Sequence, residues 1–100
     1  MTENQAAQIV QALYASVRAR LPRRWQIDLD SDHMGVGVCA YIDDVLQAIA
    51  EEQLRLDDTT AALLLPLIDY VAVHGTEADR ARVEQSARTI TLANTPVMAA

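Results

Sequence analysis

Residues 59–73 form the segment that most constrains the fold, because apolar side chains surround nearly the whole helix that they predict. The polar quartet at 57–60 opens this helix, and Gly75 ends it, as glycine commonly does at a helix C-terminus. A helix that is apolar on nearly every side normally lies at the centre of its domain. Pro66 removes one backbone hydrogen bond within it, so we expect a kink or a restart of the helix there.

The first part of the chain predicts an amphipathic helix over residues 3–20. Its apolar side chains recur every three or four positions, which places them on one helix face. Thr2 and Gln5 have the spacing of a capping box at its start. Pro22 ends the helix, because the residue before a proline avoids the helical conformation.

Two more helices are predicted before and after the apolar segment. One follows Asp43 or Asp44, either of which can serve as its N-cap, and ends near Leu56. The last helix starts after a Thr76 cap and runs to about Leu92. Its apolar side chains are few and small, so we expect it to dock lightly or to pack through small residues.

Residues 25–41 are compatible with two structures. The alternation of apolar and polar side chains from Trp25 to Asp30 has the period of a half-buried strand. The glycine-punctuated run at 35–41 can pair with this strand as a β-hairpin, which needs helices to pack on. The alternative is an irregular loop, followed by a helix that begins near Val38.

The sequence therefore predicts a mainly α fold, namely a compact bundle of about four helices with a possible short β-hairpin at 25–41. An α+β fold is the alternative. One hundred residues, of which 51% are hydrophobic, suit a single domain over 1–100 with its own core. Residues 95–100 are expected to fray.

Composition favours a cytoplasmic protein. Cys39 is the only cysteine, so no disulfide can form within the chain, and an extracellular disulfide scaffold is excluded. The first residues lack the features of a signal peptide, and no apolar run is long enough to span a membrane. Every basic residue is arginine, which we attribute to a GC-rich bacterial genome.

Charge is unevenly distributed along the chain. The net charge is −6, but residues 26–79 carry twelve acids against Arg55 alone, whereas both ends of the chain are net basic. An acidic protein is poorly suited to nucleic acid, whose binding depends on the neutralisation of phosphates. We therefore expect no nucleic-acid partner and no membrane partner.

An acidic run resembles part of a calcium-binding loop. Asp28, Asp30 and Asp32 alternate as the first acids of an EF-hand do, but His33 stands where the turn needs glycine. Cys39 stands where the bidentate glutamate belongs. We therefore predict no calcium site here.

The remaining candidates for metal or nucleophilic chemistry are also weak. His33, Cys39 and His74 lack the tight pair spacing from which zinc sites are usually built. Cys39 lies among apolar neighbours, which favours a buried, inert thiol over an activated nucleophile. The sequence thus predicts no metal, no cofactor and no catalytic residue.

Two hypotheses about function remain. The first is a protein-interaction or regulatory domain without catalytic activity, acting on a partner protein or as a homodimer. Its predicted recognition surface is the only dense basic and aromatic group: Arg18, Arg20, Arg23, Arg24 and Trp25. The second is a small enzyme or ligand-binding domain with a pocket around Asp69, Tyr70 and His74, which interrupt the apolar segment.

Overall fold

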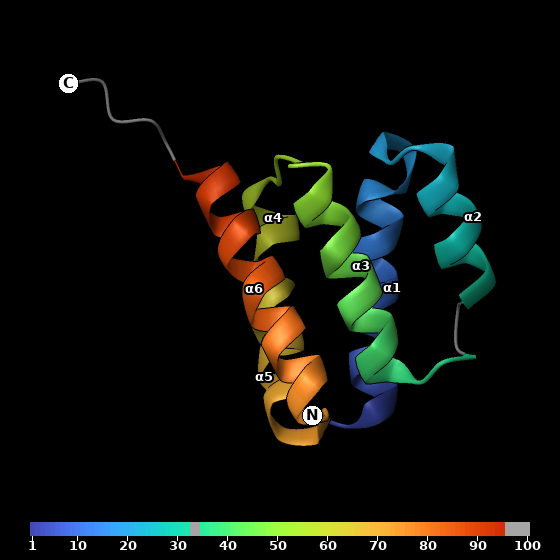
Figure 1. Cartoon of the computed structure of the whole chain (residues 1–100), viewed down its shortest axis with the longest axis vertical. Coiled ribbons are helices and arrows are strands. Elements are labelled where there is room, and N and C mark those ends of the chain that lie inside the picture. The colour runs from blue at the N-terminus through green and yellow to red at the C-terminus, as the bar shows by residue number, and fades with distance from the viewer. Residues whose placement is uncertain (33–34, 96–100) are drawn as a thin grey trace.

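The computed structural model describes residues 1–32 and 35–95, which form helices and connecting turns without any β-strand. In chain order the elements are α1 (Glu3–Val17), the 3-10 helix η1 (Arg18–Arg20), α2 (Arg23–Asp32), α3 (Val38–Glu51), α4 (Asp58–Ala61), α5 (Leu64–His74) and α6 (Glu77–Asn94). Figure 1 shows α3 between α6 on one side and α1 and α2 on the other. The radius of gyration, 13.0 Å, is that of a compact domain of this length. The mainly α prediction is confirmed, but the described residues form five helices of ten or more residues where about four were predicted, because residues 23–32 also form a helix.

Local signals explain α1, and the prediction for residues 3–20 is confirmed with η1 as its last turn. The Gln5 backbone N–H donates to the Thr2 hydroxyl at 3.1 Å, and the Thr2 backbone N–H donates to the Gln5 side chain at 2.8 Å. These two bonds complete the capping box and satisfy donors that the helix leaves unpaired. The buried residues of α1 are Ala6, Ala7, Val10, Leu13, Tyr14 and Val17.

Residues 25–41 contain no β-hairpin in the described part of the chain, so that prediction and the α+β alternative are wrong. The α2 helix starts directly after Pro22, whose carbonyl accepts the Trp25 backbone N–H at 3.0 Å. Trp25 and Leu29 are four positions apart, so one helix face turns both towards the core, while Ile27 is exposed. The spacing of these apolar residues fits the two-residue period of a strand and also the period of a helix. The helix forms because it satisfies its backbone hydrogen bonds without a partner strand.

Of the alternative prediction, the helix that begins near Val38 is confirmed by α3, whereas the irregular loop before it is wrong because residues 23–32 form α2. Gly37 precedes it with φ +90°, a conformation that favours glycine. Asp43 and Asp44 were predicted as N-caps, but they lie inside the helix, one turn beyond its start. The reason is that the apolar residues just before them, such as Tyr41, are buried and extend the helix towards its N-terminus.

The central element is α3, so the prediction of a central helix at 59–73 is wrong. The α3 helix packs against α1, α2, α5 and α6. Its fully buried side chains include Ile42, Val45, Leu46 and Ile49. It ends at Glu51, earlier than the predicted Leu56. By contrast, α5 packs against α1, α3 and α6 and leaves two large apolar side chains on its outer side in solvent: Leu65, 64% exposed, and Val73, 74% exposed.

The predicted helix at 59–73 is divided into α4 and α5. Asp57 caps α4, where its carboxylate accepts the Thr60 backbone N–H at 2.7 Å. Pro66 lies in the first turn of α5, where its missing N–H costs no intrahelical bond. The restart expected at this proline is therefore observed. Gly75 ends α5 as predicted, and a Cβ atom there would lie only 2.7 Å from the Val71 carbonyl oxygen.

The last helix, α6, begins at the predicted Thr76 cap and forms a capping box with Asp79. It ends at Asn94, close to the predicted end, and its buried residues include the small Ser86. The Asn94 side chain donates to the Leu54 carbonyl at 3.1 Å and accepts the Leu56 N–H at 2.7 Å, which ties α6 to the segment after α3.

Thr95 is exposed at the end of α6. The predicted fraying of residues 95–100 otherwise concerns residues outside the described part of the chain. Among the described residues, no helix combines the length and apolar character needed to cross a bilayer.

Candidate functional site

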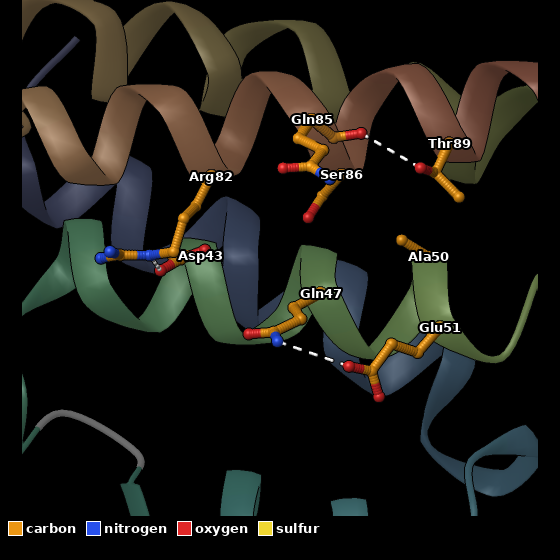
Figure 2. A pocket seen from close by; sticks show the side chains of 8 residues that line it. All are labelled: Asp43, Gln47, Ala50, Glu51, Arg82, Gln85, Ser86 and Thr89. Atoms are coloured by element: carbon orange, nitrogen blue, oxygen red, sulfur yellow. Dashed lines mark hydrogen bonds and ion pairs between the residues drawn. The ribbon is translucent and has the colours of Figure 1, made fainter.

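A polar groove of about 320 Å³ lies between α3 and α6, here called the α3–α6 groove (Figure 2). Asp43, Gln47 and Glu51 are spaced four apart on α3, so they form one row along its wall. Figure 2 shows Asp43 beside Arg82 at one end of the groove, and Glu51 nearer the other end. The groove is lined by Asp43, Gln47, Ala50, Glu51, Arg82, Gln85, Ser86 and Thr89.

The strongest electrostatic feature of this groove is a buried carboxylate. Asp43 is only 5% exposed, and its Oδ2 accepts a hydrogen bond from Arg82 Nε at 2.6 Å. Arg82 also donates to Asp79 at 3.0 Å on its own helix. A buried carboxylate is costly unless it is paired, and this ion pair therefore joins α6 to α3. The second oxygen, Asp43 Oδ1, is buried and has no hydrogen-bond partner among the described residues.

The charged side chains that line the α3–α6 groove are Asp43, Glu51 and Arg82. Its lining contains neither histidine nor cysteine, and the Thr89 hydroxyl donates to the Gln85 carbonyl on its own helix. The neighbouring Asp44 is half-buried, and burial, together with repulsion from Asp43, raises the pKa of its carboxyl. Asp43 is paired with Arg82, and Glu51 accepts a hydrogen bond from the Gln47 side chain at 3.4 Å.

All four arginines of the group that the sequence singles out are exposed, and two of them also form ion pairs. Arg18 holds Asp30 through two bonds, at 2.6 and 3.1 Å, and thereby joins η1 to α2. Arg24 lies 3.2 Å from Glu52. Arg20 and Arg23 are exposed.

Trp25, the aromatic member of that group, is half-buried and packs against the core. Its indole Nε1 is buried and has no hydrogen-bond partner among the described residues. Trp25 thus contributes to the hydrophobic core. Arg18 and Arg24 form ion pairs with Asp30 and Glu52, and each pair joins two segments of the chain. All four arginines nevertheless remain exposed.

Asp69, Tyr70 and His74 do lie together, in an open groove of about 400 Å³ that we call the Tyr70 groove. The Tyr70 and His74 rings stack with their centroids 4.5 Å apart. Burial raises the pKa of the Tyr70 phenol, which is the wrong direction for a base near neutral pH. Asp69 is exposed and has no ion pair among the described residues. Met1, Pro66 and Val73 complete the lining of this groove.

Cys39 has the environment predicted from its neighbours. It is half-buried, and burial raises the pKa of its thiol, which keeps it protonated and unreactive. His33 lies outside the described residues. Among those described, no group of three or more His, Cys, Asp or Glu side chains is placed to hold a metal ion.

The outer face of α5 is the feature that sequence reasoning missed. Leu65, Asp69 and Val73 are four apart, so they form one exposed row, here called the α5 ridge. The Tyr70 groove lies on one side of this ridge. On the other side lies the α5–α6 groove, an apolar groove of about 450 Å³ whose lining includes Leu64, Ile68 and Ile90 and no charged residue. The signal was present in the apolar pattern of residues 59–73, but it was interpreted as a central helix.

Comparisons with models of known protein families, with curated proteins and with solved structures find no match to this chain.

Proposed function

We propose that this chain is a bacterial, cytoplasmic protein-interaction domain without catalytic activity, and that it binds its partner through the α5 ridge and the grooves beside it. The observation that carries the proposal is the exposure of two large apolar side chains on α5, Leu65 at 64% and Val73 at 74%. A single cysteine, which can form no disulfide within the chain, fits a reducing compartment.

Physical chemistry favours an interface at this place. Contiguous exposed apolar surface is rare on monomeric proteins and marks sites of interaction. Leu65 also lines the α5–α6 groove, and Val73 lines the Tyr70 groove, so ridge and grooves form one continuous surface. The ridge residues make little contribution to the core, because Leu67 and Val71 supply the fully buried side of α5.

Two other proposals have weaker support. A small-ligand site in the Tyr70 groove is favoured by one observation, the convergence of Asp69, Tyr70 and His74 on it. A partner surface at the arginine group has four exposed arginines, of which Arg20 and Arg23 have no ion pair among the described residues. Neither combines exposed apolar surface with adjoining grooves as the α5 ridge does.

The test replaces the two apolar ridge residues with glutamine, a good helix former that removes the apolar surface. The double variant Leu65→Gln/Val73→Gln and the unaltered chain are used to capture proteins from the native organism, with quantification by mass spectrometry. Ile27→Gln is the matched control, because Ile27 is 54% exposed on α2. We expect a specific partner that the double variant loses and the control retains. Equal capture by all three chains contradicts the proposal.

A further inference from the structure

The α5 ridge carries one charge at its centre. Asp69 lies four residues from both Leu65 and Val73, and it is exposed without an ion pair among the described residues. A carboxylate enclosed by an interface must find a positive partner or a hydrogen-bond donor, because an unpaired charge is strongly unfavourable away from water. The ridge therefore specifies the charge of whatever covers it.

A second copy of this chain is a poor occupant. A two-fold interface uses the same patch on both copies. If two α5 helices crossed in antiparallel fashion at their middles, Leu65 of each would meet Val73 of the other, and Asp69 would lie opposite Asp69. Like charges placed together in an interface oppose association. The net charge of −6 adds long-range repulsion between copies.

A basic amphipathic helix fits the same surface. The α5–α6 groove is lined by aliphatic, threonine and asparagine side chains and by no charged residue, which suits the apolar face of a helix. Leu65 to Val73 spans about 12 Å at the rise of an α-helix, a little over two turns of a helix lying alongside. An arginine or lysine at the border of that apolar face can extend its long stem across the ridge to Asp69.

We infer that the partner segment is an amphipathic α-helix that lays its apolar face in the α5–α6 groove and places an arginine or lysine against Asp69. This inference rests on the proposed function of the α5 ridge. The acidic charge of the domain would also accelerate the approach of such a helix.

The test uses the full chain and two synthetic peptides of about 18 residues, long enough to form a helix. Both carry leucines along one helix face, and they differ only at one border position, which is arginine in one peptide and glutamate in the other. Affinity is measured by fluorescence anisotropy for the unaltered chain, Asp69→Asn and Asp69→Arg. Asp28→Asn is the matched control, because Asp28 is an exposed acid on α2.

We expect the arginine peptide to bind the unaltered chain at least about tenfold more tightly than the glutamate peptide. Asp69→Asn should abolish this preference, Asp69→Arg should reverse it, and Asp28→Asn should leave it unchanged. Equal affinity of the two peptides for the unaltered chain overturns the inference, and so does failure of the arginine peptide to bind.

Further outcomes separate this inference from the proposed function. If both peptides bind equally and Leu65→Gln/Val73→Gln abolishes both, the ridge is a binding surface, and only the charge rule is wrong. If no peptide binds while partner capture still depends on the ridge, the helical occupant is wrong and the proposed function stands. Sedimentation that shows a dimer of the unaltered chain, lost in the double variant, assigns the ridge to a second copy and overturns the inference.

Discussion

The orientation of α5 can be tested by truncating two leucines that are two positions apart on it. Leu67 is 0% exposed, whereas Leu65 is 64% exposed. Truncation of Leu67 to alanine removes buried carbon atoms worth about 0.8 kcal/mol each, which gives roughly 2.4 kcal/mol before any cavity is counted. The cavity raises the total to about 3–5 kcal/mol, the range of buried leucines elsewhere. Leu65→Ala should change the free energy of unfolding by less than about 0.5 kcal/mol.

The assay is urea denaturation of both variants and the unaltered chain. Far-UV circular dichroism follows the helices, and fluorescence follows Trp25, the only tryptophan, which packs against the core. For a domain of this size, a loss of about 3 kcal/mol lowers Tm by roughly 12 °C or more. If Leu65→Ala destabilises as much as Leu67→Ala, α5 does not face the core as described, and the α5 ridge is not a surface. If neither variant is destabilised, α5 does not belong to the core.

The remaining predictions concern single side chains. Burial, followed by the hydrogen bond to a neighbouring carboxylate, raises the pKa of Tyr14 to about 12. Because this pKa lies above the ordinary 10.0, the folded state favours the neutral phenol. The free energy of unfolding should therefore hold below about pH 10 and decline towards pH 12. Urea midpoints measured at about pH 9 and pH 11 will show this decline. Tyr14→Phe is measured at the same two pH values as the control, because it lacks the titrating phenol. If the unaltered chain loses no more stability between about pH 9 and pH 11 than Tyr14→Phe does, this expectation is wrong. The Cys39 thiol, with its raised pKa, should react with a disulfide reagent more slowly in the native chain than in denaturant, and equal rates would mean that it is not shielded. Arg82→Met should destabilise the fold, since it leaves the Asp43 carboxylate buried without its counter-ion. The matched Arg88→Met, which disrupts only an exposed pair at 3.8 Å, should have no measurable effect on Tm, and an equal effect of both changes would refute the distinction.

Local signals were sufficient to predict several helix boundaries. Thr2 and Thr76 each make a capping box with a residue three positions later, so both helix starts were evident from the sequence. Gly75 and Pro66 mark an end and a restart, because their backbone constraints act within one turn of the chain. The inert environment of Cys39 also follows from its immediate neighbours.

The sequence was ambiguous where one pattern fits two periods. Trp25, Ile27 and Leu29 alternate as in a strand, yet the first and last of these also share a helix face. The outcome depends on whether a partner strand exists, which is a property of the whole chain. The pairs Arg18–Asp30 and Asp43–Arg82 likewise join residues far apart in the sequence, so no local rule identifies them.

The sequence by itself determined that this chain is mainly helical, where α1 and α6 begin, and that residues 59–73 are apolar on nearly every side. Only the tertiary structure decided which helix is central and which side of α5 is left uncovered. Helix formation depends on hydrogen bonds and caps within a few residues, whereas burial depends on where all the other apolar faces pack. The stripe of α3 is covered by four neighbouring helices. The outer side of α5 faces solvent, and the α5 ridge is exposed for that reason.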